Sequence, residues 1–456
     1  MQLEIVKAKG LAHNSYLLSD HGEALVVDPR RDCAIYAELA ARECAKVKYI
    51  FESHCNEDFV VGSLELQRQT DAEIGHSKET DFRYGDHKLA DDDAFYVGDL
   101  KVEVLSTPGH TNDALCFAVY ERLHSDTPLF VFTGDTLLAG DVGRTDLLGM
   151  DAAAAQSKKL HNSIFERLVP LGDHLVVYPA HGIGSVCGHN MSTREFSTIG
   201  YERRMNPLLQ LDEEQFVRYL TGQFLSLPPY FRRTHDLNIA GPPPQPMPQV
   251  VREVDANEFE ELTGTGVTVI DTREPGAFAG SHIPRSLSIW LDGMSFFPGW
   301  VLGDDEPVAL VTERASDVEV ARTYLSRLGF DSVAAHLCDG IPDWRNRGKP
   351  TARLKTCSVE QLKKTVERAA VNVLDVRDES EWKEGHIKDA QHLFVGYIKQ
   401  QFKRIPKNRP LAIHCSWGGR ASLAASILLS LGYVNIYVVL GAIRAWKSLG
   451  YPLESG

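Results

Sequence analysis

The chain has 456 residues and a formal net charge of −14, with 43% hydrophobic and 24% charged residues. Its length predicts two to four domains, and its composition is typical of globular proteins. The negative charge argues against nucleic acid and anionic membranes as main partners. No apolar run approaches the roughly 18 residues that a membrane span needs, and the start of the chain lacks a secretory signal pattern, so we expect a cytoplasmic protein.

The first part of the chain alternates short apolar runs with turn residues. Residues 14–18 and 24–29 predict two paired strands that a polar turn connects. Residues 151–169 have helical periodicity, and we expect Asp151 to be the N-cap of that helix. Residues 201–224 predict a further helix.

A proline-rich segment, GPPPQPMP, occupies residues 241–248. Closely spaced prolines favour an extended, semi-rigid connection. We therefore place a first domain at 1–240 and a linker at 241–249.

The chain after the linker contains the same sequence pattern twice. Residues 267–284 match residues 371–388, and the period is about 100 residues. Such a period indicates two copies of one domain, which we place at 250–350 and 356–456. Each copy alternates short β-branched strands with helices, which predicts a parallel α/β sheet.

Four polar side chains in the first domain each follow an apolar run: His54, His110, Asp135 and His181. Glycines beside them allow sharp turns and a close approach of the backbone to a bound group. We expect the four side chains to lie along one edge of a sheet. The eight cysteines of the chain form no C-x-x-C pair, so we expect separate thiols in a reducing compartment, without disulfides or a zinc–thiolate cluster.

In the second copy, the apolar strand 411–414 leads into CSWGGR and a helix. Backbone N–H groups and a helix N-terminus stabilise anions, so Cys415 is a candidate thiolate nucleophile, and Arg420 adds a cation. Four residues separate the two, one fewer than in phosphatase-like loops, so the smaller ring suits a sulfur atom. The alternative is a buried, inert cysteine.

In the first copy, Thr312 aligns with Cys415 and Asp317 aligns with Arg420. The loop TERASD thus has neither the thiol nor the cation. We expect this copy to carry no sulfur and to serve as a spacer or a docking surface.

Both copies resemble the rhodanese (sulfurtransferase) domain, through Asp375, Arg377, the G-H-I sequence at 385–387 and the CSWGGR loop. The resemblance implies that Cys415 takes a sulfane sulfur and passes it on, with Arg420 assisting. It also implies that the copy at 250–350 is an inactive module. The residues of the persulfide loop are then Ser416, Trp417, Gly418 and Gly419.

The first domain resembles the metallo-β-lactamase fold, an αββα sandwich whose metal motif is H-x-H-x-D-H. Here His54 and Asp58 are kept, while Asn56 and Phe59 replace histidines. The later ligand positions of the family are intact: His110, Asp135 and His181.

His54, His110 and Asp135 provide two imidazoles and one carboxylate, the triad of non-haem iron(II) oxygenases, which leaves positions open for O₂ and substrate. Within this fold the chain resembles the persulfide dioxygenases, further in GDVGRTD at 140–146 and in residues 178–188. The nearest likeness is to bacterial fusions with rhodanese repeats. This implies one Fe(II) per chain, with zinc as the substitute ion. The alternative is a degenerate, metal-free domain.

Five further residues are candidates, and three of them have an alternative interpretation. Arg144 supports the active-site loop or makes a surface salt bridge. Asp58 and His181 contact substrate or water, as groups around a metal do. Tyr178 lies at the site or in the core. Cys187 holds or relays sulfur near the metal, or is a structural thiol.

The resemblance implies a persulfide dioxygenase with sulfurtransferase activity. A low-molecular-weight thiol persulfide would be oxidised by O₂ to the sulfite level, and Cys415 would move a sulfane sulfur to form or use thiosulfate. Two alternatives remain: a zinc thioester hydrolase of the glyoxalase II type, which needs two metals, and a non-catalytic sulfur carrier. We expect a homo-oligomer.

Overall fold

The computed structural model describes all residues except 123–125, 189, 224–225, 246–249 and 456. Contacts divide the chain into two compact units, and each is described by itself: Met1–Gln245 with Ser326–Gly329, and Pro246–Leu325 with Phe330–Gly456. The last four residues of the expected linker, 246–249, lie outside the described residues. None of the described helices has the length and apolarity needed to cross a bilayer.

The first unit contains two six-stranded sheets. In spatial order the first sheet holds β1 (Gln2–Ala8), β2 (His13–Asp20), β3 (Glu23–Val27), β4 (Lys46–Phe51), β5 (Glu73–Ser77) and β6 (His87–Leu89). The second holds β14 (Ser197–Thr198), β13 (Val176–Pro179), β10 (Phe130–Gly134), β9 (Leu115–Glu121), β8 (Leu100–Ser106) and β7 (Ala94–Val97). A small ribbon, β11 (Leu137–Leu138) and β12 (Asp141–Val142), follows β10.

Alternation of apolar side chains along the strands builds the core of this unit. In β2, Tyr16 and Leu18 belong to the cluster shared by the two sheets, whereas Leu17 packs with the helices on the outer face. β2 pairs antiparallel with β3, where Leu18 is opposite Leu25. The predicted pair of strands is therefore confirmed, and the period of two fixes which side chains meet between the sheets.

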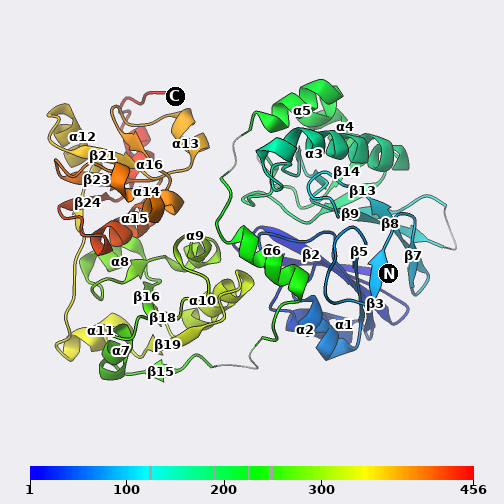
Figure 1. Ribbon diagram of the computed structural model, residues 1–456, viewed down its shortest axis with the longest axis horizontal. Coiled ribbons are helices and arrows are strands. Elements are labelled where there is room, and N and C mark those ends of the chain that lie inside the picture. Colours follow the sequence, from blue (N-terminus) through cyan, green and yellow to red (C-terminus); the bar gives the residue numbers. More distant parts are fainter. Residues whose placement is uncertain (123–125, 189, 224–225, 246–249, 456) are drawn as a thin grey trace. The chain divides into compact units, whose positions relative to one another are not determined.

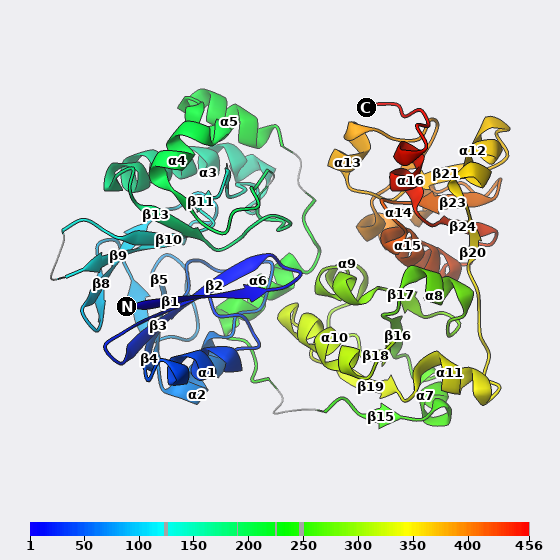
Figure 2. The ribbon, with the colours of Figure 1, turned by 180° about the vertical axis from the view of Figure 1, so that it is seen from behind.

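Helices cover the outer face of each sheet (Figures 1 and 2). On the first sheet these are α1 (Ala34–Arg42) and α2 (Ser63–Thr70). On the second sheet they are α3 (Met150–Asn162), α4 (Ile199–Met205) and α5 (Glu213–Thr221). A further helix, α6 (Phe231–Ala240), follows α5 along the chain. The predicted αββα sandwich is confirmed.

Two helix predictions need correction. α3 begins after Gly149, and Asp151 lies in its first turn without a side-chain capping bond, so Asp151 is not the N-cap. The helix continues as a π-helix, Ser163–Leu168. Within the described part of the helix expected at 201–224, which excludes residue 224, the structure has two helices, α4 and α5, because Pro207 between them has no N–H to donate.

The second unit contains two five-stranded sheets with one topology, as the sequence repeat predicts. The first copy has the order β15 (Glu253–Val254), β19 (Val333–Leu337), β18 (Val308–Val311), β16 (Thr268–Asp271) and β17 (Leu287–Ser288). The second has β20 (Lys355–Cys357), β24 (Ile436–Val439), β23 (Leu411–His414), β21 (Asn372–Asp375) and β22 (Gln391–His392). All the pairs are parallel, which confirms the prediction.

The helices of this unit complete the α/β alternation (Figure 1). The first copy contains α7 (Ala256–Thr263), α8 (Pro275–Gly280), α9 (Pro298–Val301), α10 (Ser316–Arg327) and α11 (Gly340–Asn346). The second contains α12 (Val359–Glu367), α13 (Glu379–Glu384), α14 (Ile398–Gln401), α15 (Gly419–Ser430) and α16 (Ala442–Ser448).

The D-x-R motif has a structural role in both copies. Arg377 binds Asp375 at the end of β21, with Nη2 to Oδ2 at 2.6 Å, and donates to the carbonyl oxygen of Gly385 at 2.9 Å. Arg273 makes the equivalent bonds to Asp271 and to the Ser281 carbonyl, both at 2.7 Å. The guanidinium thus fastens a strand end to the end of the following helix.

Candidate metal centre and thiol loop

The four polar residues expected at strand ends do lie at strand ends. His54 follows β4, His110 follows β8, Asp135 follows β10 and His181 follows β13. We expected them along the edge of one sheet, and this expectation was wrong. β4 belongs to the first sheet, and the other three strands belong to the second. The site therefore lies where the edges of the two sheets meet.

His54, His110 and Asp135 surround one point and are almost fully buried, at 2%, 0% and 1% exposure. Oδ2 of Asp135 lies 3.4 Å from Nε2 of His110 and 3.9 Å from Nε2 of His54. The two imidazole rings are 5.1 Å apart and nearly perpendicular. Two ligands with bonds of about 2.1 Å to one ion lie about 3.0–3.6 Å apart at bond angles of 90–120°, so the first spacing fits and the second needs a small movement.

Hydrogen bonds set the free nitrogen of each ring toward this point. His110 Nδ1 donates to the carbonyl oxygen of Arg144 at 2.8 Å, which leaves Nε2 buried and without a hydrogen bond among the described residues. Nδ1 of His54 lies 2.8 Å from Oγ of Ser53, whose own N–H donates to Asp28. Burial lowers the pKa of His110 to about 4, so its ring is neutral at pH 7. Neutral rings with a free nitrogen fit a metal ion.

The residues of the family's second metal position are paired with one another. Nδ1 of His181 lies 2.8 Å from Asp135, and Nε2 lies 3.0 Å from Asp58. Burial opposes a charge on His181, but the Asp135 carboxylate outweighs it and raises the pKa of the ring well above its ordinary value. Phe59 packs against the ring of His13 at 4.2 Å. An imidazolium and a phenyl ring thus occupy this side of the centre.

Arg144 and Cys187 are close to the triad. Arg144 is 3% exposed and binds Asp146 through two bonds of 2.6 and 2.8 Å, so it supports the loop and is not a surface salt bridge. Sγ of Cys187 lies within 4.8 Å of a His110 nitrogen and an Asp135 oxygen. Burial raises the pKa of Cys187, which favours the protonated thiol.

The contacts of Tyr178 favour its core alternative, and Glu57 is an additional residue near the triad. Tyr178 belongs to an aromatic cluster, with ring distances of 5.6 Å to Tyr16 and 5.5 Å to Phe130, which favours a core role. Glu57 was not expected at the site, because it occupies a variable position of the H-x-H-x-D-H motif. One of its carboxylate oxygens lies within 4.8 Å of nitrogens of His54 and His110.

The thiol loop of the second copy connects β23 to α15. Cys415 is fully buried, and the N–H of Gly418 donates to its sulfur at 3.1 Å. Gly418 has φ of +136°, which a side chain would strain. One backbone donor on the sulfur and the start of a helix behind it are features that stabilise a sulfur anion.

Arg420 binds a residue that the sequence did not suggest. Its Nη2 donates to Glu381 at 2.9 Å and to Oγ of Ser416 at 2.7 Å, and the Ser416 hydroxyl donates to Glu381 at 2.6 Å. This triangle fixes the loop against α13. Glu381 lies 39 positions before Arg420, so no local pattern relates the two.

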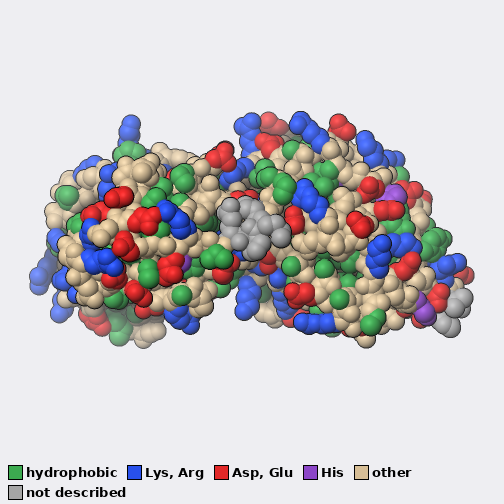
Figure 3. Space-filling model, turned by 90° about the horizontal axis from the view of Figure 1, so that it is seen from below, with side chains coloured by type: hydrophobic (Ala, Val, Ile, Leu, Met, Phe, Trp, Pro, Cys, Tyr) green, Lys and Arg blue, Asp and Glu red, His purple; other side chains and the backbone are tan. Residues whose placement is uncertain are grey.

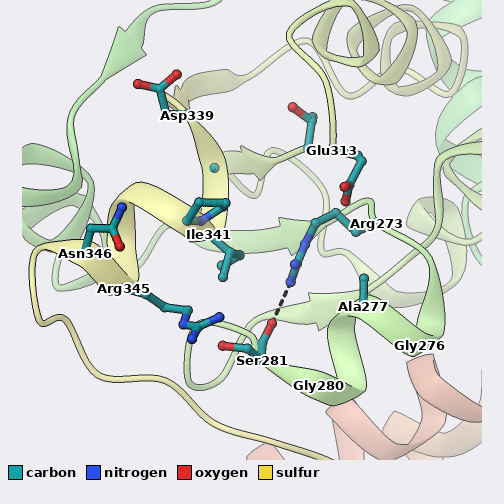
Figure 4. A pocket seen from close by; sticks show the side chains of 13 residues that line it. Arg273, Gly276, Ala277, Gly280, Ser281, Glu313, Asp339, Ile341, Arg345 and Asn346 are labelled. Atoms are coloured by element: carbon teal, nitrogen blue, oxygen red, sulfur yellow. Dashed lines mark hydrogen bonds between the residues drawn. The ribbon is translucent and has the colours of Figure 1, made fainter.

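The first copy keeps a cavity where the second has its thiol loop. Thr312 follows β18 as Cys415 follows β23, and Asp317 is paired with Arg314 at 3.0 Å. The cavity measures about 540 Å³, and Figure 4 shows Arg345 pointing into it. The residues that line it include Arg273, Ser281, Glu313, Asp339 and Ile341.

The surface carries charges of both signs. On the face shown in Figure 3, acidic and basic side chains are interspersed among the residues drawn in colour. The net charge of −14 reflects an excess of acidic over basic residues. No separate basic face is visible in that view.

Comparisons with known proteins agree with this architecture. Residues 8–181 match the Metallo-beta-lactamase superfamily, and residues 255–347 and 358–449 each match the Rhodanese-like domain. A crystal structure of a metallo-beta-lactamase from Staphylococcus aureus is 27% identical, covers 74% of this chain and 98% of its own, and has a TM-score of 0.67.

Among the curated relatives are two that each match a little under half of this chain. The probable hydroxyacylglutathione hydrolase of Schizosaccharomyces pombe is 25% identical, over 45% of this chain and 86% of its own length. The mitochondrial persulfide dioxygenase ETHE1 of Homo sapiens is 30% identical over 221 residues, which are 47% of this chain and 77% of the relative. The chain therefore belongs to the persulfide dioxygenase family, in a form whose metallo-β-lactamase domain is followed by two rhodanese-like domains.

Proposed function

We propose that the first unit binds one iron(II) ion and oxidises a low-molecular-weight thiol persulfide with O₂ to the sulfite level. The balanced reaction is RSSH + O₂ + H₂O → RSH + SO₃²⁻ + 2 H⁺. The observation that carries this proposal is the buried convergence of His54, His110 and Asp135, with a free nitrogen on His110. Two imidazoles and one carboxylate are the ligand set of non-haem iron(II) oxygenases.

When bound there, ferrous iron supplies open positions for O₂ and for an anionic sulfur. The protein positions the ligands: the Arg144 carbonyl holds the ring of His110, and Ser53 holds the ring of His54. Burial of the triad excludes water from the reacting sulfur. Cys187 is close enough to this point to contact a bound persulfide, so we propose that it borders the substrate position.

Several contacts disfavour a two-metal thioester hydrolase. His181 uses both ring nitrogens in bonds to Asp135 and Asp58, and Phe59 offers no ligand atom. A second ion there would need one ring nitrogen of His181 to lose its proton and its bond to a carboxylate. We therefore favour a mononuclear centre over the hydrolase of the glyoxalase II type.

We propose that the second rhodanese-like copy transfers sulfur through Cys415. Its persulfide would react with sulfite, Cys–SSH + SO₃²⁻ → Cys–SH + S₂O₃²⁻, so that a product of the first site is an acceptor at the second. The buried sulfur with its Gly418 donor, and Arg420 fixed at the helix start, support this role. Thr312 cannot form a persulfide, so the first copy would not share the reaction.

Oxygen uptake and product analysis test this proposal. Iron-loaded protein given glutathione persulfide should consume one O₂ per sulfite formed, and the C415S variant should keep this uptake. The wild type should convert sulfite and persulfide to thiosulfate, and C415S should not. Absence of oxygen uptake by iron-loaded protein would refute the dioxygenase assignment, whereas thiosulfate formation by C415S would refute the transfer step.

A further inference from the structure

The loop after His54 is held rigidly by α6. Nδ2 of Asn238 donates to the carbonyl oxygens of Asn56 at 2.7 Å and Phe59 at 2.9 Å. The Thr234 hydroxyl donates to the carbonyl oxygen of Glu57. Three backbone carbonyls within four residues are thus fastened to one helix, and the direction of the Glu57 side chain follows from a fixed backbone.

This side chain points at the histidine pair. One carboxylate oxygen of Glu57 lies within 4.8 Å of a ring nitrogen of His54 and of a ring nitrogen of His110. Nε2 of His110 is buried and makes no hydrogen bond among the described residues. Ligands with bonds of about 2.1 Å to one ion lie about 3.0 Å apart at right angles and about 4.2 Å apart on opposite sides, so these side chains close inward by up to about 1–2 Å when they share an ion.

We propose that Glu57 is a fourth protein ligand of the metal centre, beside His54, His110 and Asp135. The inference rests on the metal centre of the proposed function and adds a ligand to it. A glutamate three positions after His54 supplies an anionic oxygen, next in sequence to the Asn56 that replaces a histidine of the family motif.

The second carboxylate changes the properties of the centre. Two carboxylates neutralise a divalent ion, and additional oxygen ligands favour Fe(II) and Mn(II) relative to softer ligand sets. Four protein ligands leave two positions of a six-coordinate ion, enough for O₂ and one persulfide sulfur. The ligand set is then two imidazoles with two carboxylates, and the centre binds metal with a neutral charge balance.

Cobalt(II) titration of the metal-free full chain tests this ligand directly. Competition with a chromogenic chelator gives the Kd, and the visible absorption of the bound ion reports its ligands. E57Q should weaken cobalt binding by at least about 10-fold, the low end of the loss seen when groups around a metal are removed, and should alter the absorption bands. E57D, which keeps the carboxylate, should recover part of the affinity.

Glu52 provides a matched control, since it is also a buried carboxylate near the same loop but is bonded to the Tyr84 hydroxyl at 2.7 Å. E52Q should leave the cobalt affinity and spectrum unchanged. Thermal unfolding of the metal-free variants verifies that they fold. Wild-type affinity and spectrum in E57Q, together with lost binding in H54A, would overturn the role of Glu57 and leave the metal centre standing. Failure of the wild type to bind cobalt would refute the centre and this ligand together.

Discussion

Gly143 lies against both Asp135 and His110, and a single methyl group there should disrupt the centre. A Cβ on Gly143 would lie 2.0 Å from the carbonyl oxygen of Asp135 and 2.9 Å from Nδ1 of His110, whereas ordinary contacts begin at 3.4 Å. The nearest atom is backbone and cannot rotate away. Gly143 or Asp135 must therefore move by about 1.4 Å.

This displacement exceeds what a metal site tolerates. Ligands function within about 0.5 Å of their positions, and a misplacement of about 1 Å can cost about 100-fold in rate. Overpacking of this kind also costs about 1–3 kcal/mol of unfolding free energy. We expect G143A to bind iron at least about 10-fold more weakly and to lose about 100-fold in oxygen uptake.

The assay compares iron affinity, oxygen uptake and sulfur transfer in G143A and G182A. Gly182 is the matched control, because the nearest atom to its Cβ would be 4.0 Å away. G182A should behave as the wild type in all three measurements. Sulfur transfer through Cys415 should persist in G143A, since that loop belongs to the other unit. Unchanged iron affinity in G143A would refute the placement of Asp135 and His110 as ligands.

Three further changes separate the parts of the molecule. C415S should abolish transfer of sulfur from thiosulfate to cyanide while iron content stays constant, and residual transfer would contradict the role of the thiol. E381A should lower the unfolding free energy of the second unit, measured in urea, by about 2 kcal/mol. This loss is smaller than the roughly 3–5 kcal/mol expected for a fully buried ion pair, because Glu381 is 28% exposed. An unchanged urea midpoint would show that the pair with Arg420 contributes nothing to stability. Burial lowers the pKa of His76 to about 4, so from pH 6.5 downward the unfolded chain binds a proton that the folded chain does not. The contribution of His76 to the unfolding free energy should thus be fully present above pH 6.5 and fall by about 3 kcal/mol by pH 4. Urea titrations at the two pH values should show a smaller loss in H76Q than in the wild type. An equal loss in H76Q would contradict this assignment.

The sequence predicts the metal triad because its signals are local. His110 and Asp135 each follow an apolar strand and lie next to a glycine. Both features can be recognised in the sequence before the fold is known. The expectation of one sheet was wrong, because an apolar run predicts a strand and not the sheet that receives it. β4, which precedes His54, pairs with β3 and β5 in the first sheet.

The contacts that sequence reasoning missed are made by the fold. Glu381 meets Arg420 only because α13 and the start of α15 lie at the same end of one parallel sheet. Glu57 occupies a variable position of the metal motif, and the direction of its side chain depends on the bonds from α6 to the loop. By contrast, the break before α5 was visible in the sequence as Pro207, a residue that ends helices.

Metal analysis of the protein, purified without added metal, tests the mononuclear iron centre most directly. We expect about one iron per chain, lost in H110A, and oxygen uptake with glutathione persulfide that matches the sulfite released. Two zinc ions per chain without oxygen uptake would contradict a mononuclear iron oxygenase and favour a hydrolase.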